Sequence, residues 1–399
     1  MSFRLSHIHD YHRFIAIDLG LYRVKSGIYD VTNGVLANTG FSSVRQGRKN
    51  WIDGMVADIG GIAASIEQSI IQAGQSHETL PDDIIMSFPS RSFVSDMITT
   101  QYTRADTSSP LTMQEIDGMI SRIEKESYAR AHTKSRKQYG RQWDDLRLVS
   151  STIISISVDG HKVTSPIGFA GGRVRLTVLN VFVPSSEFNM IRSIISHLGK
   201  RAISIIPAPL ILPKLIEKSD LRCTASCLVD IWYGHTTVTI LEDNEIIAFE
   251  TFPYGVETLI DMIGQSMPHT TSLQIENIIC TSAECRHGAA HDTINEFLSY
   301  ISDTIFAYLQ TERIDIRFDS LLLYGNLFEN TVIRDRFTAL LQDALSYTLT
   351  IERLHEHITP AITHDQAVVS GLSLMASELL LTRKDPLVRI MRYVLYQYE

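Results

Sequence analysis

Two strand–turn–strand patterns, each with an aspartate at the end of its first apolar strand, constrain the fold of this 399-residue chain more than any other feature. The first is FIAIDLGLYRVKSGIYDV at residues 14–31, and the second is VDIWYGHTTVTILEDNEIIAFE at residues 229–250. A tight turn after a buried strand can direct backbone N–H groups at an anion, so each pattern is a candidate phosphate-binding hairpin. Two such hairpins predict two halves with a cleft between them.

The turn of the second pattern departs from what phosphate binding requires. Trp232 and Tyr233 stand where the backbone has to approach a phosphate closely, and glycine is the residue that permits this approach. Either the two rings plug a vestigial cleft and stiffen it, or they swing away from a site that still binds a phosphate-containing ligand weakly. Competent hydrolysis is a third interpretation, although no residue stands out as a catalytic base.

Composition excludes several classes of protein. A formal net charge of −9 argues against a general electrostatic attraction to nucleic acid. No apolar run reaches the roughly 18 residues of a membrane-spanning helix, and the N-terminal residues lack the apolar block of a signal peptide. A hydrophobic content of 44% over 399 residues is enough for two or three packed units. We therefore expect a cytoplasmic protein with no nucleic-acid partner.

Changes of pattern divide the chain into two halves and an insertion. An alternating strand pattern at residues 91–103 marks a boundary, and a capping box at Thr112 and Glu115 then starts a helix. The charged continuation of this helix at residues 125–141 predicts a solvated helix end or a loop. Alternating strands follow at residues 148–158 and 173–183, before α/β patterning resumes. In the second half, a polar stretch at residues 264–291 separates two predicted helices.

The order of the motifs resembles FtsA, the family of bacterial actin-like proteins that tether the FtsZ ring to the membrane. IDLG at residues 17–20 and VDIWYGHTT at residues 229–237 are similar to the two phosphate motifs of that family, and LLLYGN at residues 321–326 is similar to its adenosine motif. The other resemblances are FPYG at 252–255 to the segment after the second phosphate motif, DGHKVTSPIGFAGGRVRL at 159–176 to the end of an inserted SHS2-type subdomain, and AVVSGLSLMA at 367–376 to the terminal connecting helix.

The resemblance implies an α/β, actin-like (ribonuclease H-like) two-lobed fold with an inserted SHS2-type subdomain. Residues 13–91 and 185–222 would form the first lobe, and residues 92–184 the inserted subdomain. Residues 223–380 would form the second lobe, with a reduced subdomain at residues 265–300. Residues 381–399 would form a short linker and a C-terminal amphipathic helix.

The cofactors that the resemblance implies are ATP and Mg²⁺. Asp18 and Asp230 would hold a hydrated Mg²⁺ from opposite sides of the cleft. Gly20 and Gly234 would let N–H groups face phosphate, and Thr236 would add a hydroxyl. The nucleotide-binding residues are therefore expected to be Asp18, Gly20, Asp230, Gly234, Thr236 and Gly325. The adenosine motif keeps a single glycine, and Glu284 stands where the family often has a lysine.

Residues 386–399 predict a short basic amphipathic helix. Asp385 and Pro386 make a favourable helix start, and the apolar side chains that follow gather on one side of a helical wheel. Such a helix can lie in the interface of an anionic membrane, as the resembled family's anchor does, or dock on the protein's own body. The expected membrane-binding residues are Leu387, Arg389, Ile390, Met391, Arg392, Val394 and Leu395.

The sequence thus predicts a cytoskeletal scaffold, non-enzymatic or weakly ATP-binding, that tethers FtsZ filaments to the inner face of the cytoplasmic membrane during cell division. Its partners would be the FtsZ C-terminal tail, further copies of itself in filaments, and an anionic membrane surface. Two alternatives stay open. One is a PilM-like scaffold of type IV pilus assembly, which lacks the basic tail helix. The other is an actin-fold, ATP-using enzyme such as a sugar kinase or a chaperone ATPase.

Overall fold

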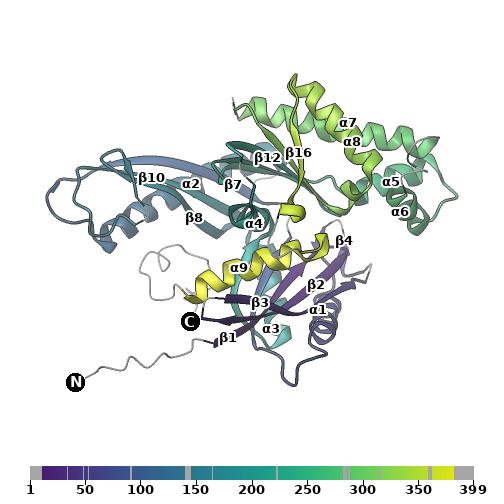
Figure 1. Ribbon diagram of the computed structural model, residues 1–399, viewed down its shortest axis with the longest axis horizontal. Helices are drawn as coiled ribbons and strands as arrows, with labels where there is room; N and C mark the ends of the chain where they lie inside the picture. The colour runs from purple at the N-terminus through teal and green to yellow at the C-terminus, as the bar shows by residue number, and fades with distance from the viewer. Residues whose placement is uncertain are drawn as a thin grey trace. The chain divides into compact units, whose positions relative to one another are not determined.

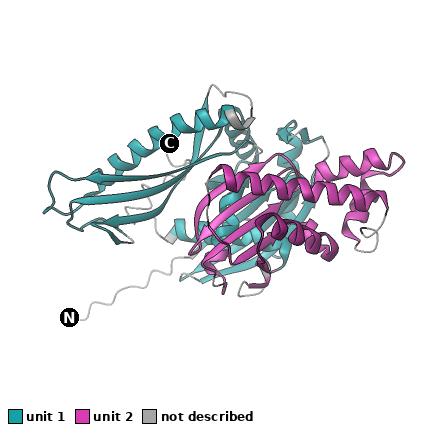
Figure 2. Cartoon of the chain, turned by 90° about the horizontal axis from the view of Figure 1, so that it is seen from above, with its two compact units in different colours: residues 1–215, 363–399 teal, residues 216–362 magenta. Residues whose placement is uncertain are grey.

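The computed structural model describes residues 11–381, except residues 34, 48, 53, 90–91, 140–144, 164, 222, 282–284, 286–287, 313, 315 and 358–361. The chain divides into unit 1, residues 1–215 with 363–399, and unit 2, residues 216–362, coloured separately in Figure 2. Helix α4 (Ile211–Lys218) runs across the boundary between them. The helix predicted at residues 386–399 and Glu284 lie outside the described residues.

Unit 1 is built on a mixed sheet with the order β11-β6-β1-β2-β3. Strands β1 (Tyr11–Leu19), β2 (Arg23–Thr32) and β3 (Val35–Arg45) pair antiparallel, and β6 (Asp83–Phe88) and β11 (Arg201–Pro207) add parallel to β1 and to each other. The β1–β2 hairpin confirms the strand–turn–strand pattern predicted at residues 14–31. A short pair, β4 (Trp51–Ile52) and β5 (Met55–Val56), lies outside this sheet.

Helices cover both faces of this sheet (Figure 1). Helix α1 (Ile59–Ala73) packs on β2 and β3 and against α3 (Ser185–Leu198), whereas α9 (Ala367–Leu381) packs on β1 and β2. Neighbouring residues of β2 show that the two faces differ: Ile28 lies beside the end of α1, and the Tyr29 hydroxyl is 3.3 Å from Ser370 Oγ of α9. Helix α9 therefore belongs to unit 1, which corrects our expectation that all of residues 223–380 form the second lobe.

The inserted module forms an antiparallel sheet of order β7-β10-β8-β9 with one helix on it. Its elements are β7 (Val94–Thr103), α2 (Met113–Tyr139), β8 (Leu146–Val158), β9 (His161–Lys162) and β10 (Arg173–Pro184). The predicted capping box is present, because Glu115 Oε2 accepts from Thr112 N–H at 2.9 Å and Thr112 Oγ1 accepts from Glu115 N–H at 3.3 Å. The charged segment at residues 125–139 is helical rather than a loop, because Ser127, Ala131 and Ser135 bury one side of it.

Unit 2 is built on a second mixed sheet, with the order β14-β13-β12-β15-β16. Its strands are β12 (Ala225–Ile231), β13 (Thr236–Glu242), β14 (Glu245–Phe252), β15 (Ser320–Tyr324) and β16 (Thr350–Arg353). Its helices are α5 (Val256–Ser266), α6 (Ser272–Cys280), α7 (Ala289–Thr311) and α8 (Thr331–Leu345). Helix α6 lies in the stretch at residues 264–291 that was expected to be polar and for which no helix was predicted. None of the residues described between 265 and 300 is in a strand.

Membrane-spanning helices were not expected from the sequence. Among the described residues, no helix is both long enough and apolar enough to cross a bilayer.

Candidate nucleotide-binding turns

The first predicted turn joins β1 to β2 in unit 1. Asp18 lies one residue before the end of β1, is almost completely buried, and accepts a hydrogen bond from Ser87 Oγ at 2.9 Å. The N–H of Gly20 donates to the carbonyl of Arg23 at 3.1 Å, and the Gly20 carbonyl accepts from the Gln46 side chain. The Gly20 N–H that the sequence assigned to phosphate is therefore engaged in closing the hairpin.

Lys25 is the buried cation of this turn. Antiparallel pairing places it opposite Asp18, and its Nζ lies 3.0 Å from Asp365 Oδ1, just before α9. Burial raises the pKa of Asp18, although the charge of Lys25 and the Ser87 hydrogen bond oppose this shift. Burial is the largest single influence on Asp365 and acts to raise its pKa, but the charge and hydrogen bond of Lys25, with the charges of His364 and Arg23, together outweigh burial and lower the pKa. The positive charge of Lys25 thus acts on two carboxylates, Asp18 with a raised pKa and Asp365 with a lowered pKa.

Sequence reasoning missed this three-residue cluster. Lys25 could have been found by counting across the hairpin, because residues paired in register face the same side of the sheet. Asp365 could not, since it is distant in the chain and no local pattern connects it to β2.

We expect Asp18→Asn to stabilise the protein at pH 7 by about 1–2 kcal/mol, because the variant removes a carboxylate that is buried at a cost. A raised folded pKa means that Asp18 contributes stability below its unfolded pKa and loses it as the pH rises through the folded value. The difference between variant and wild type should therefore vanish below the ordinary aspartate value of 3.8 and grow toward neutral pH. Urea unfolding midpoints between pH 3 and pH 8 measure this. A variant less stable than wild type at pH 7 would contradict the expectation.

The second predicted turn joins β12 to β13 in unit 2, and its backbone is bonded to the start of α5. The N–H groups of Val256 and Glu257 donate to the carbonyls of Trp232 and Tyr233 at 3.0 and 2.7 Å. The Trp232 N–H donates to the carbonyl of His235 at 2.8 Å. These bonds satisfy N–H groups of the first helical turn, which otherwise attract anions.

The side chains of this turn contact unit 2 itself. The Trp232 ring stacks on His235 with centroids 6.0 Å apart and also lies near Tyr324, and Tyr233 packs against the hydrophobic core. The Thr236 hydroxyl donates to the carbonyl of Tyr254 at 2.7 Å, so its proton is engaged within unit 2. Gly234 is buried between these residues. The rings therefore have structural partners, which favours the interpretation that they stiffen the turn.

Gly255, the residue just before α5, packs against this turn, and sequence reasoning quoted it without giving it a role. A Cβ added there would lie 2.5 Å from His235 N, 2.5 Å from Trp232 O and 2.6 Å from Tyr233 O. All three are backbone atoms of the β12–β13 turn. Close approach of α5 to the turn is therefore possible only with glycine at this position.

Gly325 follows β15 and lies next to the end of β12. The parallel pairing of these strands sets Tyr324 beside Asp230, and a Cβ on Gly325 would lie 2.4 Å from the carbonyl oxygen of Ile231. The φ angle of Gly325 is +114°, which side-chain-bearing residues rarely adopt. Asp230, Gly234, Thr236 and Gly325 are therefore gathered at one end of the unit 2 sheet, whereas Asp18 and Gly20 lie in unit 1.

The fit of these residues to ATP and Mg²⁺ is poor. Two of the donors assigned to phosphate, the Gly20 N–H and the Thr236 hydroxyl, already donate to backbone carbonyls. Within the described residues no group of three or more His, Cys, Asp or Glu side chains could hold a metal ion. Shared ligation of a hydrated Mg²⁺ by Asp18 and Asp230 stays a prediction, and no reaction step is derived through it.

Comparison with known proteins gives a distant relative in sequence. No protein-family model matches the chain. Over 242 residues, or 58% of the chain, it is 22% identical to the cell division protein FtsA of Streptococcus pneumoniae serotype 2 (strain D39 / NCTC 7466). The match spans 48% of that protein, so the chain covers about half the length of the curated relative it matches.

Solved structures resemble the chain along most of its length. A PilM-PilN type IV pilus biogenesis complex has a chain that matches with a TM-score of 0.65 and 16% identity, covering 91% of this chain and 98% of that one. The ethanolamine utilization protein EutJ from Carboxydothermus hydrogenoformans matches with a TM-score of 0.50 and 10% identity, covering 91% and 89%. The fold is actin-like. Its two mixed five-stranded sheets confirm the predicted α/β class.

A nucleotide-bound structure also occurs among the matches. The ROK family glucokinase from Streptomyces griseus, in complex with glucose and AMPPNP, matches with a TM-score of 0.45. A similarity of this extent gives no information about ligands of this chain.

Proposed function

We propose that this protein is a scaffold of the FtsA type, which binds partners and does not turn over ATP usefully. The observation that carries the proposal is the sequence similarity to FtsA over more than half of the chain, in a protein with an actin-like fold. The engaged donors of the two turns support the non-enzymatic part, because a phosphate would have to break existing hydrogen bonds to reach them.

The scaffold would tether FtsZ filaments to the inner face of the cytoplasmic membrane during cell division. The membrane contact would be residues 386–399, with an apolar side inserted in the interface and Arg389 and Arg392 near the headgroups. Helix α9 is ordered on unit 1 to Leu381, so the tether would start from unit 1. One short helix binds membranes marginally, and self-association into filaments would multiply the anchor through avidity.

Deletion of residues 386–399 tests this proposal. We expect the full chain to sediment with vesicles that contain anionic phosphatidylserine, and the truncated chain to stay in the supernatant. The Arg389→Glu/Arg392→Glu variant is a matched control that keeps the helix length, and it should lose binding to anionic vesicles in particular. If the truncated chain sediments as fully as the intact one, the tether proposal is wrong.

A second candidate is a PilM-like scaffold of type IV pilus assembly. The observation that favours it is the extent of the structural match, which covers 98% of the pilus protein's chain. The same centrifugation experiment separates the candidates, because the pilus-type scaffold predicts that residues 386–399 do not bind lipid, so that the intact chain would stay in the supernatant as the truncated chain does. The FtsZ C-terminal tail and filament self-association are proposed partners of the first candidate only.

A further inference from the structure

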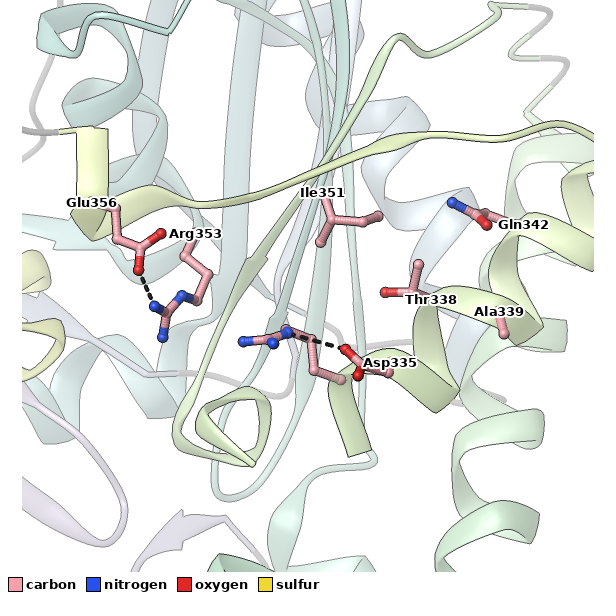
Figure 3. A pocket seen from close by; sticks show the side chains of 8 residues that line it. Asp335, Thr338, Ala339, Gln342, Ile351, Arg353 and Glu356 are labelled. Carbon is pink, nitrogen blue, oxygen red and sulfur yellow. Dashed lines mark hydrogen bonds and ion pairs between the residues drawn. The ribbon is translucent and has the colours of Figure 1, made fainter. Parts of the chain in front are cut away.

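The charged side chains that line the groove between helix α8 and strand β16 in unit 2 bond one another. Arg334 pairs with Asp335 at 3.5 Å, and Arg353 bonds Glu356, as Figure 3 shows. Their charges are met within the protein, so the groove gives no sign of a ligand. A buried amide in the inserted module of unit 1 differs from these groups, because no described residue bonds it.

This amide belongs to Asn180 of strand β10. The side chain is fully buried, and neither Oδ1 nor Nδ2 has a hydrogen-bond partner in the part of the chain that the structure describes. Val178 and Phe182, two residues before and after it, pack in hydrophobic clusters that contain residues of α2. Because alternate residues of a strand share a face, the amide of Asn180 also faces α2. An unpaired buried amide is costly, and native proteins satisfy such groups with protein atoms or ordered water.

Asp96 is the polar neighbour of Asn180 on β7, since the two residues are paired in register. Its Oδ2 accepts from Ser127 Oγ at 2.8 Å, and its Oδ1 lies 3.2 Å from Arg130 Nε. Both donors of α2 are thus directed at Asp96, and an ionised carboxylate only accepts hydrogen bonds. None of these three groups therefore supplies a proton to Asn180 Oδ1. We call Asp96, Ser127 and Asn180 the polar layer.

The chemistry of the amide decides which class of ligand fits it. A partner for both atoms has to donate to Oδ1 and accept from Nδ2. Water does both, and a buried water typically makes about three hydrogen bonds, the third of which Asp96 can accept. A cation would suit Oδ1 but would be repelled by the protons of Nδ2, and Arg130 already offsets the charge of Asp96. Water is therefore the ligand that fits.

The polar layer separates two parts of the core of the module. On one side, the residues that α2 adds to the hydrophobic cluster are Ile116, Met119, Ile120 and Ile123. On the other side, Ala131 is the one described residue of α2 in the cluster around Phe182, and Tyr128 adds an edge contact to that ring. The second half of α2, residues 127–139, is thus held by few apolar contacts. Segments of this kind open at a lower free energy than the rest of a domain.

From these observations we infer that the inserted module binds an ordered water between Asn180 and Asp96, and that this hydrated layer lets the second half of α2 open separately from the first. The bound water satisfies the amide while the helix is closed, and solvent satisfies it when the helix opens. Opening therefore leaves no polar group of the layer unpaired. Opening of the first half would instead expose the large apolar side chains of its cluster to water. The inference holds whatever the partners of the protein are.

Two substitutions of Asn180 test for the water. Valine is close to asparagine in volume and leucine is larger, so leucine fits without strain only if it can take the space of the water. We expect Asn180→Leu to join the two clusters and to slow hydrogen exchange in the second half of α2 by about tenfold or more. Asn180→Val should slow it less, because it leaves part of that space unfilled. Arg175→Leu, at an exposed position of β10, is the matched control and should leave the exchange unchanged.

Hydrogen exchange of the full chain, followed by mass spectrometry of its peptides, measures the two halves of α2 separately. In the wild type, residues 127–139 should be at least about tenfold less protected than residues 113–126. Equal protection of the two halves would overturn the separate opening. Any result in which Asn180→Leu does not slow exchange more than Asn180→Val does, including failure of the leucine variant to fold, would mean that there is no space for a water, and it would overturn the inference.

Discussion

Replacing Gly255 with alanine is expected to destabilise unit 2 by about 3 kcal/mol or more. The added Cβ would lie about 2.5 Å from backbone atoms of His235 and Trp232, well inside any real contact distance. Neither α5 nor the β12–β13 turn can move away easily, because the two are joined by the hydrogen bonds that Val256 and Glu257 donate to the turn. Relief of the clash has to break these bonds or shift the whole helix.

Urea unfolding followed by tryptophan fluorescence measures the effect, since Trp232, one of the three tryptophans of the chain, lies in the turn. Gly264→Ala is the matched control in the same helix. A Cβ there would lie 3.6 Å from Ile275 Cδ1, which is an ordinary contact, and alanine is the better helix former by about 1 kcal/mol. The control should therefore be as stable as wild type or more stable. Equal stability of the two variants would show that the turn and α5 are not rigidly joined.

Much of the fold could be predicted because its signals are local. The β1–β2 and β12–β13 hairpins follow from alternating apolar strands that flank short turns, and the inserted module follows from the Thr112–Glu115 capping box and two alternating strands. Helix α6 was missed although it carries the same kind of signal. Thr271 and Gln274 form a capping box, and Ile275 and Ile279 are buried one turn apart. The polar residues between them hid this pattern.

The candidate site was predictable in position and not in chemistry. Asp18, Asp230 and Gly325 do lie at strand ends, as the apolar runs before them predicted. Whether Gly20 and Thr236 offer donors to a ligand depends on where Arg23 and Tyr254 place their carbonyls. Contacts of this kind depend on tertiary packing, which periodicity does not encode. The Lys25–Asp365 ion pair could not be predicted either, because it also depends on tertiary packing.

Replacing Lys25 with methionine is expected to destabilise unit 1 at pH 7 by about 2–4 kcal/mol, because it leaves buried Asp18 without its cation. Methionine keeps the apolar stem of the side chain, so the loss measures charge rather than packing. Asp365 adds to this loss of stability. Its pKa is lowered in the folded state, so its charged form stabilises the fold above the unfolded pKa, and that contribution disappears with Lys25. The Asp18 effect should shrink as the pH falls from 7 toward the ordinary aspartate value of 3.8, because the raised pKa of Asp18 makes its carboxyl group neutral above that value. The Asp365 effect should shrink as the pH falls below 3.8, because the pKa of Asp365 is lowered.

Addition of Asp18→Asn to the Lys25 variant should recover a large part of the lost stability, since no buried carboxylate is then left uncompensated. Lys200→Met is the matched control, because its partner Asp82 is 81% exposed and such a pair contributes under about 1 kcal/mol. Chemical unfolding of wild type, Asp18→Asn, Lys25→Met and the double variant at pH 3 and pH 7 gives the coupling free energy between Asp18 and Lys25 directly. A loss that is as large at pH 3 as at pH 7, or a double variant no more stable than Lys25→Met, would mean that Lys25 acts through packing. A coupling that disappears with acid instead shows that Lys25 stabilises the fold through its charge, by compensating the buried carboxylate of Asp18.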